Sequence, residues 1–236
     1  MSTSTLASLG LRAMLANQAA LQTVGQNIAN ANTPGYSRQS VVLTTPQGQS
    51  SGAGYFGKGV NVQTVVRAHN DFLTRQAANT AALASMDLTR LTQMTQLEQA
   101  FPIGDAGLGA AADAFLNAMV DVASSPSDPS ARQVALGRAQ DLATRYQSAG
   151  QQLADLQAGI NSDLKANVGT VNDLAKQIAS VNEQISQANG SGHSPNDLLD
   201  KRDQLISSLS QFVQVSTVPA DDGSLGVFIG GGQRLV

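Results

Sequence analysis

The 236-residue sequence predicts a mainly α fold, with a long helical bundle or coiled-coil-like middle domain and small β elements near the N-terminus and at the C-terminal end. The first observation behind this prediction is an apolar repeat between Gln151 and Ala188, where Leu, Ile or Val recurs every three or four residues. The second is that alternating, strand-like patterns occupy only 39–45, 59–67 and the stretch after Phe212. The third is composition, since only 13 % of residues are charged and 4 % aromatic.

The first predicted element is a helix over residues 5–30. Its polar positions carry Gln and Asn rather than charged residues, and its large apolar residues recur at spacings of three and four. We expect these apolar residues to form one packing face: Leu11, Met14, Leu15, Leu21, Val24 and Ile28. Because isolated helices owe most of their stability to packing, we expect residues 1–35 to be largely disordered in a free monomer.

A turn is predicted directly after this helix, within the segment NIANANTPGYSRQ at residues 27–39. Thr33–Tyr36 favours a type II turn, because proline presets φ at the second position and glycine accepts a positive φ at the third. We expect the turn to lead into the two strand-like segments, with a Gly-rich loop between them, and Tyr36 to pack or hydrogen-bond against a neighbouring group.

Helical patterns return at 71–99 and 109–123. Asp128 before Pro129 predicts the start of a further helix, because Asp is a favoured N-cap and proline suits the first helical position.

The apolar stripe over 153–185 is the strongest periodic feature of the sequence. Gly159 and Gly169 each weaken a helix by about 1 kcal/mol, which burial of the stripe outweighs. We expect the stripe to pack against 71–99 and 131–149.

The C-terminal part is predicted to change from helix to strand. Residues 194–197 (SPND) resemble a capping box that opens a helix ending near Leu209. Two strand-like runs, FVQVSTV and LGVFI, then flank Asp222-Gly223, which predicts a hairpin turn. The chain therefore divides into a helix, turn and extended connector at 1–70, a helical middle domain at 71–211, and the start of a β-rich domain at 212–236.

The sequence pattern supports no catalytic, cofactor or metal site. The absence of cysteine excludes thiol nucleophiles, disulfides and cysteine-ligated zinc, and the two histidines lie far apart in sequence. Gly52–Gly57 matches G-x-G-x-x-G, but a strand-like segment follows it rather than a helix. Asp197, Asp200 and Asp203 have Lys201 and Arg202 among them, which favours a solvated, ion-paired face. We therefore predict no enzymatic activity, cofactor or metal.

Charge and hydropathy argue against nucleic-acid binding, a membrane span and a secretory signal. A net charge of −3 offers no basic character for nucleic acid, no stretch is apolar enough to span a membrane, and the N-terminus lacks a secretory signal pattern. The first 70 residues contain no Asp or Glu. An acid-poor leader of this kind is typical of an organellar transit peptide, or of a segment that buries itself against a partner.

Several motifs resemble one known family in the same order along the chain. NIANANTPGYSRQ is similar to the N-terminal motif of rod, hook and junction proteins of the bacterial flagellar axis, and its PGYSRQ form resembles the first hook-associated protein family. GKGVNVQTVVRAHNDFLTRQ, SSPSDPSARQVAL, LLDKRDQLISSLSQFVQV and DGSLGVFIGGGQRLV extend the resemblance over essentially the whole chain.

The resemblance implies a structural subunit at the junction between hook and filament, which self-associates in an axial assembly through paired terminal helices. It implies contacts with the hook protein and a second junction protein, and export without a cleaved signal through the flagellar type III apparatus, with an export chaperone as a further partner. The assembly motif that it marks consists of Asn27, Asn30, Asn32, Thr33, Pro34, Gly35 and Tyr36. Residues 1–70 then correspond to the axial segment and 212–236 to the start of an outer domain.

Members of the family continue well beyond the length of this chain and end in another helical segment. We therefore expect either a fragment or a shortened form. A cytoplasmic coiled-coil adaptor and a secreted type III effector fragment are the alternative functions.

Overall fold

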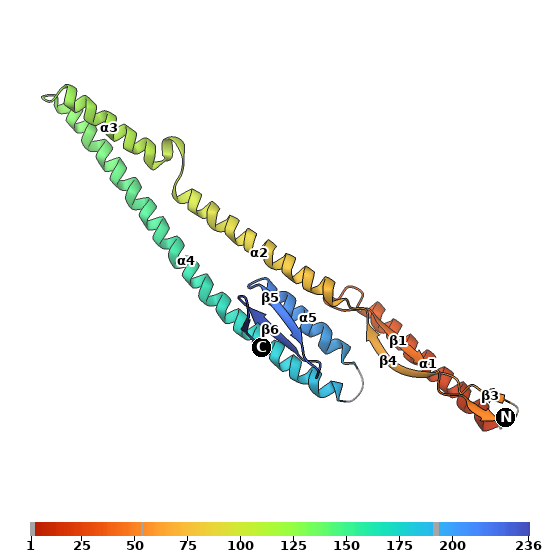
Figure 1. Cartoon of the computed structure of the whole chain (residues 1–236). Coiled ribbons are helices and arrows are strands. Elements are labelled where there is room, and N and C mark those ends of the chain that lie inside the picture. The colour runs from red at the N-terminus through yellow and green to blue at the C-terminus, as the bar shows by residue number, and fades with distance from the viewer. Residues whose placement is uncertain (1–2, 53, 191–193) are drawn as a thin grey trace. The chain divides into compact units, whose positions relative to one another are not determined.

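The computed structural model describes residues 3–52, 54–190 and 194–236. The chain divides into two compact units, one made of Met1–Leu83 with Val171–Val236 and the other of Ala84–Thr170. Helices dominate both units (Figure 1), and short strands occur near the N-terminus and at the C-terminal end. The prediction of a mainly α fold with small β elements is confirmed.

The N-terminal part of the first unit combines one helix with an antiparallel ribbon. α1 spans Thr3–Ala29, and it contacts both β1 (Gln39–Thr44) and β4 (Asn61–Arg67), which pair with each other. The register of this ribbon shifts between Val42 and Leu43, as at a β-bulge. The predicted helix, turn and two strands are all present.

The Gly-rich stretch between these strands is not a plain loop. It contains β2 (Gln49–Ser51) and β3 (Gly54–Phe56), which pair as a small antiparallel hairpin. Assigning this stretch to a loop was wrong, because strands of three residues are too short to show an alternating pattern. The G-x-G-x-x-G match at Gly52–Gly57 thus coincides with hairpin residues and precedes no helix.

The second unit contains helices from the middle of the chain. α2 spans Asp71–Ala100, η1 Gly104–Ala106, α3 Leu108–Ser124 and α4 Pro129–Asn189, so α2 and α4 each continue into the first unit. The helix start at Pro129 is confirmed, because the Asp128 carboxylate accepts a hydrogen bond of 2.8 Å from the backbone N–H of Ser130.

The continuity of α4 corrects one packing prediction. Residues 131–149 and 153–185 belong to the same 61-residue helix, so the first segment cannot pack against the second. Within the second unit, side chains from residues 88–99 of α2 and 152–163 of α4 instead line an open groove.

A small hydrophobic core lies at the C-terminal end of the chain. α5 (Asn196–Ser210) lies beside the end of α4 and the hairpin of β5 (Val215–Pro219) and β6 (Leu225–Ile229), to which β7 (Gln233–Arg234) adds a short edge (Figure 1). The predicted hairpin is confirmed, with Gly223 at φ +85°. The core consists of Val171, Ile178, Ile206, Leu209, Val215 and Val227.

The predicted capping box at the start of α5 is wrong. Pro195 occupies the N-cap position and no side chain caps the helix. The Asn196 amide instead donates a hydrogen bond of 2.8 Å to the carbonyl of Val65 in β4, so this side chain joins α5 to the N-terminal ribbon. Residues 191–193, which include His193, lie outside the described residues.

Candidate assembly surface

The predicted turn has type II geometry. The Tyr36 N–H donates a hydrogen bond of 3.2 Å to the Thr33 carbonyl, and Gly35 has φ +81°. Pro34 precedes this glycine, and the chain turns here from α1 toward β1. A Cβ built on Gly35 would meet the Gln204 side chain of α5 at 3.2 Å, so both backbone conformation and space favour glycine.

Asn27 holds the turn to the helix. Its amide donates to the Gln39 carbonyl at 2.8 Å and accepts from the Gln39 N–H at 2.8 Å, while the Tyr36 hydroxyl donates to the same amide oxygen at 2.9 Å. The amide therefore pairs with the first residue of β1 as a neighbouring strand would. Tyr36 is half-buried and finds its partner within the chain.

The other motif residues are arranged around the end of α1. Asn30 donates to the Gln26 carbonyl at 3.0 Å, and its side-chain oxygen accepts from the Thr33 hydroxyl at 3.2 Å. These bonds satisfy polar groups where the helix ends. Asn32 and Pro34 are exposed. The structure thus brings the motif residues together at the end of α1 and in the turn that follows, with side-chain hydrogen bonds at Asn27, Asn30, Thr33 and Tyr36.

Helix α5 lies against this turn through its carboxylates. The Ser37 N–H donates to Asp200 at 2.9 Å, and the Gln39 side chain donates to Asp197 at 3.3 Å. Residues more than 150 positions apart in sequence therefore form one polar junction. A shallow groove lined by the turn and by α5 runs along it.

The aspartates of α5 are ion-paired as the sequence suggested, but only Asp197 is exposed, while Asp200 is buried and Asp203 is partly buried. Arg67 at the end of β4 pairs with Asp200 at 2.8 Å and with Asp203 at 2.5 Å, and its side chain and that of Asp200 are each 9 % exposed. Arg202 is also buried. The predicted solvation was wrong for Asp200 and Asp203, because only neighbours along the helix were considered, whereas the cation that pairs with these carboxylates comes from a distant strand.

The electrostatics of the junction favour a neutral tyrosine. Partial burial, followed by the negative charges of Asp197 and Asp200, raises the pKa of Tyr36 above its usual value. The hydroxyl therefore stays protonated at neutral pH and can donate to Asn27.

Helix α1 buries small residues and exposes large ones. Ala16 and Thr23 are buried on the side that contacts β1 and β4. The predicted packing face is exposed by 51 % to 73 % of each side chain's area: Leu11, Met14, Leu15, Leu21, Val24 and Ile28. Leu6 and Leu9 add to this apolar surface. Exposed apolar surface of this extent is typical of an interaction site.

The β1–β4 ribbon removes the reason for expecting α1 to be disordered in a free monomer. Disorder of residues 1–35 in the monomer was predicted because an isolated helix owes most of its stability to packing against a partner. The ribbon is such a partner, and it contacts the face opposite to the one predicted.

Other kinds of site find little support in the described parts of the chain. No group of three or more His, Asp or Glu residues there is arranged to hold a metal ion. None of the helices described is long and apolar enough to cross a membrane.

Two known protein families match this chain, and one of them matches the segment that forms the exposed α1 face and the turn. The family of flagella basal body rod proteins matches residues 9–36, which contain most of α1 and the whole turn. The family described as the helical domain of flagellar hook-associated protein FlgK matches residues 94–236. These two matches place the chain among structural proteins of the bacterial flagellum. The chain belongs to the FlgK family of flagellar hook-associated proteins.

Individual relatives support the assignment. The chain is 34 % identical over 235 residues to flagellar hook-associated protein 1 of Salmonella typhimurium LT2, covering 99 % of this chain and 42 % of the relative. It is 33 % identical over 235 residues to the Escherichia coli K12 protein of the same name, covering 99 % of this chain and 43 % of that one. The chain therefore spans about two fifths of the length of these relatives.

A solved structure is similar as well. The flagellar hook junction protein FlgK from Burkholderia pseudomallei matches with a TM-score of 0.63 and 38 % identity, over 69 % of this chain and 28 % of that one. The FlgK family consists of structural flagellar proteins.

Proposed function

We propose that this chain is part of a structural subunit at the junction between hook and filament, and that it self-associates through terminal helices. The observation that carries the proposal is the exposed apolar face of α1, which lies in the segment that matches flagellar rod proteins. Burial of this face between subunits would remove large apolar side chains from water, at about 1.5–3 kcal/mol for each one fully buried.

The polar junction has a supporting role in this proposal. Asn27, Tyr36 and the carboxylates of α5 fix how α1 joins the rest of its unit. A subunit that stacks on copies of itself needs such a fixed direction, because small errors at one contact are repeated at the next. The motif residues then act by positioning α1 rather than by contacting a ligand.

The remaining assignments follow from the same proposal. Residues 1–70 form the axial segment, 71–211 the middle domain and 212–236 the start of an outer domain. The hook protein and a second junction protein are the neighbours in the assembly. The protein leaves the cell through the flagellar export apparatus without a cleaved signal, assisted by an export chaperone, and it has no catalytic activity.

Complementation of a strain that lacks this protein tests the proposal. The test variant is Leu21→Ser with Ile28→Ser in the full-length protein, which makes two exposed positions of the α1 face polar. The control is Leu88→Ser with Leu164→Ser, at positions of α2 and α4 that are 66 % and 60 % exposed. We expect the α1 variant to be exported but absent from sheared, washed flagella, with loss of motility, and the control to assemble.

Normal assembly of the α1 variant would contradict the proposed role of this face. Retention of the wild-type protein in the cytoplasm while flagellar export is active would favour a cytoplasmic adaptor instead. Comparison with an export-blocked strain separates these outcomes.

A further inference from the structure

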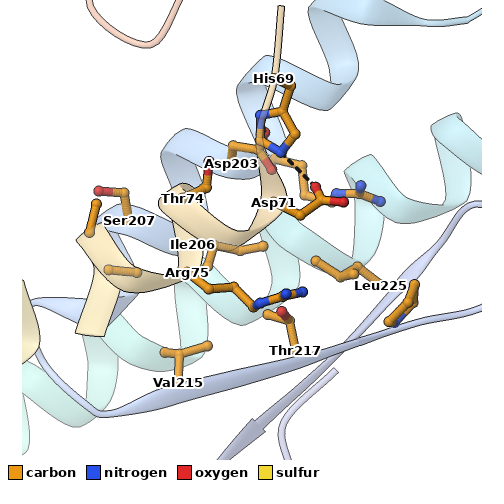
Figure 2. A pocket seen from close by; sticks show the side chains of 14 residues that line it. His69, Asp71, Thr74, Arg75, Asp203, Ile206, Ser207, Val215, Thr217 and Leu225 are labelled. Carbon is orange, nitrogen blue, oxygen red and sulfur yellow. Dashed lines mark hydrogen bonds and ion pairs between the residues drawn. The ribbon is translucent and has the colours of Figure 1, made fainter. Parts of the chain in front are cut away.

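The two units differ in how their carboxylates are paired. In the first unit, a cavity between the start of α2, α5 and the β5–β6 hairpin has its acids satisfied by the chain itself, and Asp71 contacts His69 there at 2.7 Å (Figure 2). The second unit, Ala84–Thr170, is described throughout, and its residues form one ion pair, between Arg138 and Asp141 at 3.8 Å. Most carboxylates of the second unit therefore have no cation within the chain.

Charge in the second unit is separated along the sequence. Residues 91–131, which include α3, contain five acids and no Lys or Arg. The start of α4 follows directly and carries Arg132, Arg138 and Arg145 with a single acid, Asp141. α3 and the start of α4 thus carry opposite net charges.

Both of these helical segments bury small residues and expose large ones. Four alanines are buried, two on each helix: Ala111, Ala118, Ala135 and Ala149. Arg145 ties α4 to the segment that precedes α3, because it donates to the carbonyls of Asp105 at 3.0 Å and Gly107 at 3.2 Å. The large apolar residues of the two segments are consequently left at the surface.

The side of α3 that faces away from its buried alanines is both apolar and acidic. Asp113, Leu116 and Val120 follow one another at spacings of three and four, which places them on one face of the helix. Leu116 is 59 % and Val120 is 62 % exposed. We call these three residues the α3 face.

The start of α4 exposes a stripe that is apolar and basic. It consists of Arg132, Leu136, Ala143 and Tyr146, whose spacings of four, seven and three keep them along one side of the helix. Leu136 is 60 % and Tyr146 is 59 % exposed. Arg132 bonds to the Pro126 carbonyl, which leaves its positive charge without an anion. We call these four residues the α4 stripe.

We propose that the α3 face of one copy of this chain docks on the α4 stripe of a second copy. Asp113 then pairs with Arg132, and the apolar residues of the two surfaces pack together. The contact joins two different surfaces, so each copy keeps one free surface of each kind and the contact can repeat, as an axial assembly requires. This inference rests on the proposed self-association and adds a second contact to it.

Sedimentation equilibrium of the 236-residue chain tests this contact apart from the α1 face. Every sample, called the parent, carries Leu21→Ser with Ile28→Ser, so a failure here is separate from a failure of the role proposed for α1. We expect the weight-average mass of the parent to rise with protein concentration. Added sodium chloride should lower this mass, because salt screens exposed charge pairs.

Charge reversal in the parent supplies the variant test. Asp113→Lys and Arg132→Asp each bring like charges together, and each should weaken association at least about tenfold. An equal mixture of the two variants restores opposite charges at every contact between unlike copies and should associate as the parent does. Asp87→Lys with Arg90→Asp, at exposed positions of α2, is the matched control and should leave association unchanged.

Three results would overturn the proposal: a parent whose mass is independent of concentration, unchanged association in either variant, and no recovery in the mixture. The full-length protein with the same polar α1 face provides a fourth. If it stays monomeric where the 236-residue chain associates, a further segment of the same subunit covers the α3 face and the proposed partner is wrong.

Discussion

Helices α5 and α1 belong to the same unit but differ in whether their large apolar residues are buried. α5 places Ile206 and Leu209 in a closed core, where Leu209 is 0 % exposed. α1 buries Ala16 and Thr23 and leaves Leu21 73 % exposed. The difference teaches that apolar periodicity identifies a face of a helix without identifying what covers it. In α5 the cover is the chain's own hairpin, and in α1 we propose that it is another subunit.

α4 and α1, by contrast, each use an asparagine side chain to hold a neighbouring strand. Asn182 of α4 donates to the Leu225 carbonyl at 2.8 Å and accepts from the Leu225 N–H at 3.1 Å. Asn27 of α1 makes the same pair of bonds with Gln39. In each case one asparagine on a helix satisfies both backbone groups of a strand residue, which fixes the strand against the helix.

The largest expected effect comes from emptying the closed core. Leu209→Ala should lower the free energy of unfolding by about 4 kcal/mol, because it removes buried methyl groups and leaves a cavity. Leu21→Ala, the same change on the exposed face of α1, should alter it by less than about 0.5 kcal/mol in a monomer. Urea denaturation at low protein concentration measures both. Similar losses in the two variants would remove the distinction between the helices.

The next effect concerns the ion pairs that join β4 to α5. Arg67→Met leaves Asp200 and Asp203 without their cation, and we expect a loss of about 3 kcal/mol in unfolding free energy. Arg38→Met is the control, since Arg38 is an exposed arginine near the same turn. If both variants unfold at the same urea concentration, the junction contributes no more than a surface charge does.

A smaller effect is expected at the turn. Gly35→Ala should destabilise by about 1–2 kcal/mol, because alanine resists φ +81° and its methyl group would crowd Gln204. Gly25→Ala, in the C-terminal part of α1, meets open space and should stabilise by up to about 1 kcal/mol. Thermal unfolding of the two variants should shift in opposite directions, and a shift in the same direction would contradict the turn geometry.

The smallest effect is a pH dependence. The pKa of Tyr36 is raised in the folded protein, so its neutral form contributes stability that is fully present below the unfolded-state pKa near 10. That contribution is lost as the pH rises through the higher folded-state value. Wild type should therefore lose more stability than Tyr36→Phe above about pH 10, measured by urea denaturation across this range. Parallel curves would show that the phenol has no role in the junction.

The sequence by itself determined the elements that depend on local pattern. It predicted α1, α2, α3 and the start of α4 at Pro129, because helical spacing and capping act over a few residues. It also predicted the turn at Gly35 and the hairpin at Gly223, since a positive φ selects glycine. It missed the β2–β3 hairpin, whose strands are too short to carry a pattern.

Only the tertiary structure decided which faces are covered and which charges are paired. The stripe of α4 looks uniform in sequence, yet Ile178 and Ile185 are 0 % exposed while Leu164 remains 60 % exposed. Asp200 lies beside Lys201 in sequence but pairs with Arg67, 133 positions away. Burial and ion pairing depend on segments brought together from distant parts of the chain, so a repeat or a local charge cluster cannot specify them. For the same reason, the sequence indicated the large apolar face of α1 but not that its small-residue face is the one packed within the chain.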